Sequence, residues 1–266
     1  MLACLCLLFT TPCVAVAQDA VPRSIAGVSE EMTARFSGIR ATAWGEAIPG
    51  ITRSLAAVPS VQATGVENGF AVFLTLDACG GDTDMRIISL VRELRIPVTL
   101  FVTNRWLARN TRLARELARD PLFLFAAHGA RHKPASVTGR CAFGVKGTAS
   151  VAELVREVEE NAESIQALTG TRPAWFRAGT AHYDAVAVAV IHALGFSIAG
   201  YTVNADAGAT LTAPAVAQRV RTAGNGAIIL AHANRPQSGT AEGLARGLPA
   251  LLKAGARFAH LPMMPE

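Results

Sequence analysis

Residues 73–81 read FLTLDACGG, and this stretch predicts a strand followed by a loop. Large apolar side chains and a β-branched threonine fill positions 73–76, which is typical of a strand that is covered on both faces. Gly80 and Gly81 would end the strand in a loop. Asp77 is therefore expected at the carboxyl end of a buried strand, and its role has to be inferred from the rest of the chain.

Short apolar runs alternate with segments of helical period on the carboxyl side of this stretch. Six or seven such repeats predict parallel strands joined by helices, either as a barrel or as an open, doubly wound sheet. Both folds place their chemistry at the carboxyl ends of the strands. The predicted strands are 71–77, 97–103, 122–127, 174–177, 196–203, 227–231 and 257–261, and the predicted helices are 84–94, 105–118, 150–168, 184–194, 213–223 and 240–253.

The helix at 150–168 has the clearest ends. Ser150 and Glu153 form a capping box at its start, and Gly170 suits its end.

The composition agrees with one globular α/β domain, since 51% of the 266 residues are hydrophobic and 17% are charged. The formal net charge of +5 comes from scattered basic residues, so we expect no nucleic-acid partner.

The first 17 residues, MLACLCLLFTTPCVAVA, are predicted to be a secretory signal peptide. An apolar run too short to span a bilayer leads to an A-x-A pattern at 15–17, which is typical of a cleavage site. We therefore expect a secreted protein, periplasmic or extracellular, with no membrane insertion after signal removal.

Residues 18–69 are expected to be an N-terminal extension packed on the barrel. Cys79 and Cys141 remain after cleavage, and a disulfide between them is left open.

Two histidines follow the predicted strand at 122–127. His128 and His132 in HGARH are four residues apart, which on a helical turn points both imidazoles the same way and suits metal ligation. With Asp77 from another strand end they form a set of two histidines and one carboxylate, suited to Zn²⁺ or a similar divalent ion. Such an ion would lower the pKa of its water toward ~7 and polarise a carbonyl.

Three more polar residues follow predicted strands, at positions 177, 206 and 232. His232 lies outside the paired histidines, so we expect it to act as an acid that protonates a leaving group. Asp206 would orient His232 and keep it charged. Arg177 follows PAWF, at a further strand end.

The order of these motifs resembles that of the polysaccharide deacetylases, carbohydrate esterase family 4, whose shared unit is the NodB homology domain. LTLDACGG resembles T-F-D-D-G-P, in which the first aspartate is the catalytic base and the second is a metal ligand. HGARH resembles the H-S-x-x-H metal motif, and WFRAGTAHYD resembles F-R-x-P-x-G, which makes Arg177 the residue that orients the base. TVNADAGA stands at D-x-x-D-W and IILAHA resembles I-I-L-x-H, so Asp206 would be the partner of the catalytic histidine and His232 the general acid.

The resemblance covers residues 70–262 and implies a distorted (β/α) barrel of seven to eight parallel strands. Residues 70–266 would be a deacetylase-like catalytic domain. The implied activity is the metal-dependent hydrolysis, with Zn²⁺ as the expected ion, of N- or O-acetyl groups on a carbohydrate or cell-envelope polysaccharide. Two other functions stay open on this fold: hydrolysis of a non-sugar C–N amide, and glycan binding by a catalytically impaired protein.

The chain departs from the family pattern most seriously at Ala78, where the family has its second aspartate. Two histidines alone lack the charge and geometry for tight Zn²⁺ binding. Three explanations stay open. Asp77 itself is a metal ligand, or Asp82 or Asp84 supplies the third ligand, or the site is catalytically inactive. We favour the first, because Asp77 is on the most rigid element. Asp84 is equally placed to cap the helix that follows it.

A proline of the third motif is also replaced, by Ala178, and no tryptophan follows Asp206. Aromatic residues make up only 6% of the chain, which gives little sign of a long sugar-stacking groove.

Overall fold

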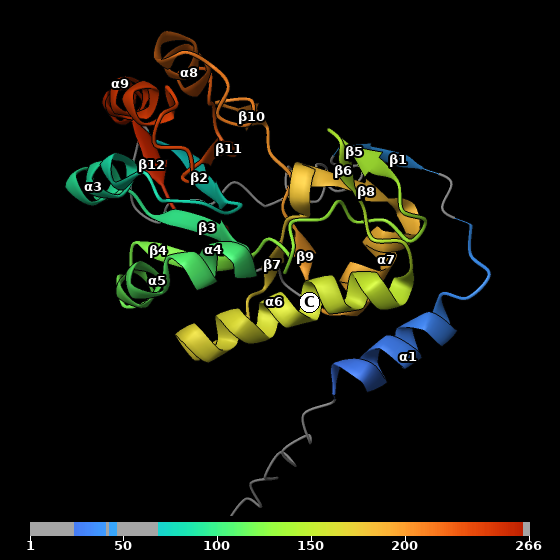
Figure 1. The fold of residues 1–266 in the computed structure, drawn as a ribbon. Coiled ribbons are helices and arrows are strands. Elements are labelled where there is room, and N and C mark those ends of the chain that lie inside the picture. Colours follow the sequence, from blue (N-terminus) through green and yellow to red (C-terminus); the bar gives the residue numbers. More distant parts are fainter. Residues whose placement is uncertain (1–23, 41–42, 47–68, 263–266) are drawn as a thin grey trace, which may run out of the picture.

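Eight parallel strands form one curled sheet (Figure 1). The computed structural model describes residues 24–40, 43–46 and 69–262, so the predicted signal peptide at 1–17 lies outside the described residues. The strand order is β10-β11-β2-β3-β4-β7-β9, and β12 pairs with the first residues of β2. Within the described residues the two end strands of this order do not pair, so the barrel is open between them. The predicted distorted (β/α) barrel of seven to eight parallel strands is confirmed. The strands are β2 (Phe70–Ala78), β3 (Val98–Val102), β4 (Phe123–Ala127), β7 (Trp175–Phe176), β9 (Ser197–Ile198), β10 (Val203–Asn204), β11 (Ala227–His232) and β12 (Ala256–Phe258).

Helices connect the strands and cover the outer face of the sheet (Figure 1). None of the described helices is long and apolar enough to cross a membrane. The helices that follow β2 are α3 (Met85–Glu93), α4 (Asn104–Arg109), α5 (Thr111–Leu117), α6 (Val151–Thr169), α7 (Ala185–Ala193), α8 (Ala213–Val220) and α9 (Thr240–Lys253).

Helix α6 has the predicted ends. The side chain of Ser150 accepts a hydrogen bond from the backbone N–H of Glu153 over 3.1 Å. Gly170 ends the helix with a φ of 77°, a left-handed conformation that costs glycine little.

Two of the predicted elements are broken in the structure. The predicted helix at 105–118 is broken at Asn110, whose side-chain amide donates to the carbonyl oxygens of Gly81 and Trp106. The predicted strand at 196–203 is two short strands, β9 and β10, which pair with different neighbours. It breaks where the carbonyl oxygens of Ala199 and Gly200 accept hydrogen bonds from a buried arginine side chain instead of from a strand.

Side chains alternate along β2 between two cores. The side chains of Val72, Leu74 and Leu76 lie in the layer between the sheet and the helices. Ala71 and Phe73 lie on the inner side, in a smaller cluster. This alternation, which follows from the period of two in a strand, decides which residues at the end of β2 reach the interior.

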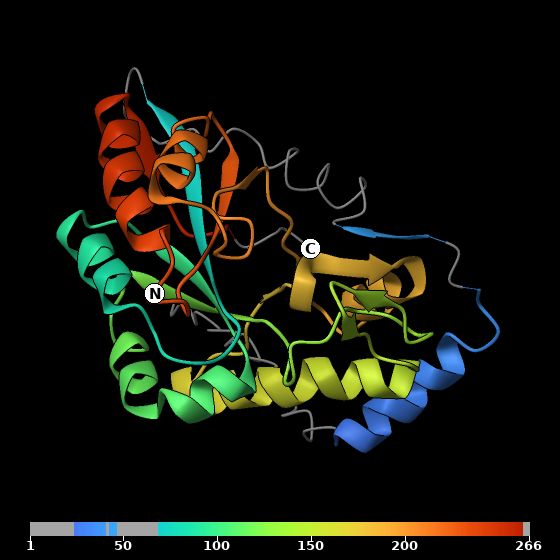
Figure 2. The same cartoon turned by 45° about the horizontal axis from the view of Figure 1, so that its top comes forward.

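The described parts of the predicted extension contact the later chain. Helix α1 (Ile25–Arg35) packs against α6, and Figure 2 shows it crossing beside one end of that helix. Strand β1 (Trp44–Glu46) pairs antiparallel with β8 (His182–Asp184). A short hairpin of β5 (Cys141–Ala142) and β6 (Val145–Lys146), which was not predicted from the sequence, lies before α6. Cys79 and Cys141 are both free cysteines.

Candidate active site

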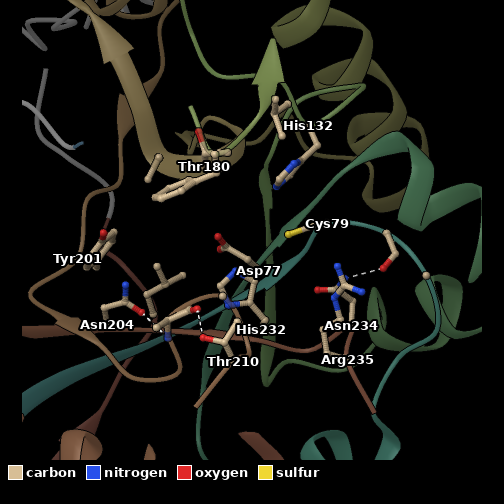
Figure 3. A pocket seen from close by; sticks show the side chains of 18 of the residues that line it. Asp77, Cys79, His132, Thr180, Tyr201, Asn204, Thr210, His232, Asn234 and Arg235 are labelled. Atoms are coloured by element: carbon tan, nitrogen blue, oxygen red, sulfur yellow. Dashed lines mark hydrogen bonds between the residues drawn. The ribbon is translucent and has the colours of Figure 1, made fainter. Parts of the chain in front are cut away.

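The carboxyl ends of the strands open into a cavity of about 810 Å³. Asp77 and His232 are register partners on the adjacent strands β2 and β11, so their side chains leave the same face of the sheet. Figure 3 shows both around the same space as Cys79 and His132. The cavity thus gathers chemically active groups from segments that are far apart in the sequence.

Asp77 is buried and forms an ion pair with Arg177, which follows β7 and is also buried. Nη1 of Arg177 donates to Oδ1 of Asp77 over 2.7 Å and to Oγ1 of Thr75 over 3.0 Å. Nε and Nη2 donate to the carbonyl oxygens of Ala199 and Gly200, over 3.1 and 2.9 Å. These bonds fix the guanidinium group and, through it, the orientation of the Asp77 carboxylate.

The pKa of Asp77 lies below its usual value. Burial acts to raise this pKa, but the positive charges of Arg177, His128 and His232 together outweigh it. Asp77 is therefore ionised at neutral pH. One of its oxygens is occupied by Arg177, and the other, Oδ2, lies 3.5 Å from Nε2 of His128.

The orientation of His128 is set from both its ring and its backbone. Nδ1 lies 2.7 Å from the carbonyl oxygen of Arg177. A carbonyl oxygen only accepts, so Nδ1 donates. Nε2 is then the nitrogen that holds the second proton when the ring is charged and the lone pair when the ring is neutral. The backbone N–H groups of His128 and Gly129 donate to Oδ1 of Asn161 on α6, over 2.8 and 2.9 Å. Nε2 is thus directed at Asp77 and Cys79.

His132 lies in a turn whose backbone has a φ of +63°, not on a helix. Oε1 of the buried Glu157 accepts the backbone N–H groups on either side of it, from Arg131 over 2.8 Å and from Lys133 over 3.1 Å. The His132 and His128 ring centroids are 4.8 Å apart. A buried glutamate therefore fixes the turn that brings the two imidazoles together.

Cys79 also lies at the site, although no sequence motif marked it as a site residue. Its Sγ lies 3.5 Å from Nε2 of His128, and the potential ligand atoms of Cys79, His128 and His132, here called the Cys-His-His group, lie within 4.8 Å of one another. Burial acts to raise the pKa of Cys79, but hydrogen bonds with three neighbouring histidines hold it well below its usual range. A thiolate and two imidazoles are typical Zn²⁺ ligands, so these residues fit a metal ion.

The two loop aspartates considered as alternative ligands are engaged elsewhere. Asp82 is exposed and accepts a hydrogen bond from Arg109 over 2.7 Å. Asp84 is buried, accepts the backbone N–H of Arg86 as the N-cap of α3, and pairs with the guanidinium of the same residue over 2.7 Å. The prediction that Asp84 caps this helix is confirmed. Neither carboxylate is part of the Cys-His-His group.

His232 and Asp206 form a second pair at the cavity. Nδ1 of His232 lies 2.9 Å from Oδ1 of Asp206. Oδ2 of Asp206 accepts the backbone N–H of His232 over 2.8 Å and the hydroxyl of Thr240 over 2.9 Å. Burial acts to lower the pKa of His232, but the hydrogen bond with Asp206 and contact with Cys79 raise it well above its usual value.

The cavity wall also contains polar and aromatic groups that were not predicted from the sequence. Oδ1 of Asn234 and Oγ1 of Thr180 are buried and have no hydrogen-bond partner among the described residues. Phe143, between β5 and β6, is 80% exposed at the cavity. Arg105 and Arg235 also line it and are exposed. No short motif signals these residues, because the cavity wall is assembled from loops.

Backbone strain is concentrated around the same cavity. Five of its lining residues other than glycine have φ values between 48° and 67°, a region that costs side-chain-bearing residues free energy. Strain of this kind persists where surrounding contacts over-determine the backbone, which is typical of binding sites and active sites. The residues are His132, Phe143, Thr180, Ala181 and Ala207.

A family model described as polysaccharide deacetylase matches residues 65–199. The chain belongs to the polysaccharide deacetylase family. No curated protein matches it. The match begins just before β2 and ends in the segment after β9, so it includes Asp77, both histidines of the turn and Arg177, while Asp206 and His232 lie beyond it.

Solved structures of carbohydrate esterase family 4 share the fold of this polysaccharide deacetylase family member. A pseudoenzyme from Bacillus anthracis is 24% identical with a TM-score of 0.59, covering 71% of this chain and 62% of that one. A mutant of it with restored enzymatic activity has a TM-score of 0.61, at 24% identity, covering 72% and 65%. The chain therefore spans less than two thirds of their length.

Two further structures match more of their own length. A family 4 carbohydrate esterase from Streptomyces lividans, in complex with acetate, is 22% identical with a TM-score of 0.61, covering 72% of this chain and 93% of that one. PdaA of Bacillus subtilis, also a family 4 carbohydrate esterase, is 18% identical with a TM-score of 0.61, covering 82% and 88%.

Proposed function

We propose that this family member is a secreted, metal-dependent hydrolase that removes N- or O-acetyl groups from a carbohydrate or cell-envelope polysaccharide. The observation that carries the proposal is that one cavity region combines a fixed carboxylate, a pair of histidines and a carboxylate-bound imidazole. Hydrolysis of an acetyl group needs a base, a carbonyl-polarising site and an acid, and these groups suit the three tasks. They are Asp77 with Arg177, His128 with His132, and His232 with Asp206.

His128 and His132 would contribute ligands to a divalent metal ion. Zn²⁺, the ion that imidazole ligands suit well, supplies a water of lowered pKa when bound and polarises the acetyl carbonyl. Asp77 lies beside this pair, with Oδ2 3.5 Å from Nε2 of His128. That oxygen is placed to accept a proton from the attacking water or to bind the metal, while Arg177 keeps the carboxylate ionised and oriented.

His232 is the proposed general acid. Its Nδ1 is bound by Asp206, so Nε2 is the nitrogen that can give a proton to the substrate. The water oxygen bonds to the acetyl carbon, and the C–N or C–O bond to the sugar breaks. The proton on His232 goes to the departing amine or alkoxide, and the products are acetate and the deacetylated sugar.

The test is acetate release by the full chain from chito-oligosaccharide, peptidoglycan and acetylated xylan. Asp77→Asn and His232→Ala are each expected to reduce kcat by roughly 100-fold or more, the usual contribution of a general base or acid. His192→Ala is the matched control, because His192 lies on α7 and does not line the cavity. An Asp77→Asn variant that keeps full metal content and full activity would contradict the role of Asp77.

Glycan binding without turnover is a second candidate, which Ala78 favours because the family pattern has a metal-ligand aspartate there. Binding of the oligosaccharides by wild type, without acetate release and without bound metal, would support it. Hydrolysis of non-sugar amides alone would instead support the other enzymatic hypothesis. Fractionation of cells that express the full chain tests whether residues 1–17 direct secretion.

A further inference from the structure

The position of Ala78 at the end of β2 shows that it faces away from the cavity. Strand β2 includes Ala78, which pairs in register with Val102 of β3. The Ala78 side chain is fully buried in the outer core, on the same side as Leu74 and Leu76. Since side chains alternate in a strand, Asp77 is directed to the opposite side, into the cavity, and Cys79, the first residue after the strand, also lines the cavity. A ligand at the end of this strand therefore has to come from position 77 or 79.

The backbone around Cys79 is fixed by hydrogen bonds from several elements. Its carbonyl oxygen accepts from Oγ1 of Thr103 over 2.8 Å. The carbonyl oxygens of the next two residues, Gly80 and Gly81, accept from the side-chain amides of Asn234 over 2.6 Å and Asn110 over 2.9 Å. Figure 3 shows the Asn234 bond beside the cavity. The backbone that carries the thiol is thus fixed by contacts within the chain, which favours a preorganised ligand.

We propose that Cys79 is the third protein ligand of a metal centre with His128 and His132, in place of the carboxylate that the family pattern has at position 78. Sγ of Cys79 lies 3.5 Å from Nε2 of His128, the nitrogen that carries the lone pair when the ring is neutral, and all three ligand atoms lie within 4.8 Å of one another. The thiolate carries the same single negative charge as a carboxylate. It favours Zn²⁺ over hard cations such as Mg²⁺.

This assignment leaves Asp77 to act as the base. Oδ1 of Asp77 is bound by Arg177, and the carboxylate needs no further role in metal binding if Cys79 completes the ligand set. Three protein ligands and one open position form the arrangement typical of catalytic zinc sites. The proposal rests on the metal dependence of the proposed function, although it does not depend on which acetylated substrate is used.

Substitution of Co²⁺ for the native metal tests the ligand without any activity measurement. Wild type loaded with Co²⁺ is expected to show a thiolate-to-cobalt charge-transfer band in the near ultraviolet. Cys79→Ala and Cys79→Ser should lack the band, and Cys141→Ala should retain it, because Cys141 is exposed and lies outside the cavity. Far-ultraviolet circular dichroism checks that each variant is folded.

Zinc affinity, measured by competition with a chromophoric chelator, is the second readout. Loss of an outer-sphere partner alone weakens metal binding by roughly 10- to 100-fold, so Cys79→Ala should weaken it by more than ~100-fold. Cys79→Asp should recover part of that affinity without the charge-transfer band. The proposal is overturned if Cys79→Ala binds zinc as tightly as wild type, or if the wild-type cobalt spectrum has no thiolate band.

These results are distinguishable from failure of the proposed function. A Cys79-dependent metal centre in a protein that releases no acetate from any substrate would support the ligand and refute the deacetylase. Acetate release that requires Asp77, together with a Cys79→Ala variant that keeps its metal, would support the deacetylase and refute Cys79 as a ligand. That result would favour Asp77 as the ligand.

Discussion

The backbone of Gly179 lies directly against that of His132. A Cβ built on residue 179 would be 2.2 Å from the carbonyl oxygen of His132, which is far inside van der Waals contact. The N–H of Gly179 also donates to the carbonyl oxygen of Lys133 over 3.1 Å. The loop after β7 and the turn that carries His132 are therefore one packed unit, and a side chain at position 179 has to displace the turn.

We expect Gly179→Ala to reduce zinc affinity by about 10-fold or more and to destabilise the fold by roughly 1–3 kcal/mol, the cost of an overpacked position. Chelator competition and urea unfolding measure the two effects. Gly224→Ala is the matched control, because a Cβ there meets nothing within 4 Å and the backbone is not left-handed. Wild-type zinc affinity in Gly179→Ala would show that the turn does not position His132.

The pair of His232 and Asp206 predicts a pH dependence. Burial acts to lower the pKa of His232, but the hydrogen bond and charge of Asp206, together with the contact with Cys79, raise it well above its usual value. A general acid must be protonated, so activity falls as the pH rises through this pKa. Removing the carboxylate in Asp206→Asn lowers the pKa, and the alkaline limb of kcat/KM should move to lower pH by about 1 to 3 pH units.

Thr240→Val is the control for this experiment. It removes one hydrogen bond to Oδ2 of Asp206 but leaves the carboxylate, so the alkaline limb should move much less. An Asp206→Asn profile that keeps the wild-type alkaline limb, at any residual activity, would contradict the role of His232 as the acid.

An aspartate introduced at position 78, where the family pattern has one, is not expected to bind the metal. The Ala78 side chain lies in the apolar outer core, so Ala78→Asp would bury a carboxylate without a partner. We expect a destabilisation on the order of 3–5 kcal/mol, and no gain in zinc affinity. Ala78→Asn, of similar shape without the charge, should destabilise less. Urea unfolding and chelator competition check both variants, and a stable Ala78→Asp with tighter zinc binding would show that residue 78 reaches the metal.

Two arginines at the cavity predict a preference for acidic substrates. Arg105 and Arg235 line the cavity, are exposed, and form no ion pair with any described residue. Replacing either with alanine should raise KM for an oligosaccharide that carries a carboxylate by up to about fivefold, the equivalent of an exposed ion pair of ~1 kcal/mol. KM for a neutral oligosaccharide should stay unchanged.

Steady-state kinetics at low and high salt measures this preference. Added salt should reduce the difference between the two substrates, because it screens exposed charges. Arg112→Ala is the control, since Arg112 is exposed on α5 and does not line the cavity. Equal increases of KM for both substrates would contradict recognition of charge.

Much of the barrel could be predicted from the sequence, because buried parallel strands require continuous apolar runs and the connecting helices have their own period. The strand before Asp77 and the capped helix from Ser150 are examples. The break at Asn110 was not predictable, since its cause is a hydrogen bond to Gly81 in a distant loop. The splitting of the strand at 196–203 likewise depends on contacts with Arg177.

The site shows the same division. Polar groups that follow buried strands are easy to recognise in a sequence, so most of the site residues could be predicted. They are Asp77, His128, His132, Arg177, Asp206 and His232. Cys79 was not predicted, because a single cysteine after a strand is not a recognisable motif and the family pattern has its ligand at position 78. The period of two in a strand would have placed residue 79 beside residue 77. Phe143 and Asn234 belong to loops, whose course no local pattern predicts.

The direction of Ala78 also affects how members of this family are sorted into active and inactive proteins. A chain that lacks the second aspartate of the family pattern would be classified as a pseudoenzyme from its sequence alone. Here the strand continues through position 78, so the side chain of that residue packs in the outer core. The side chain of the next residue, Cys79, lines the cavity. Family members with alanine at this position therefore have to be inspected one residue further along before they are counted as inactive.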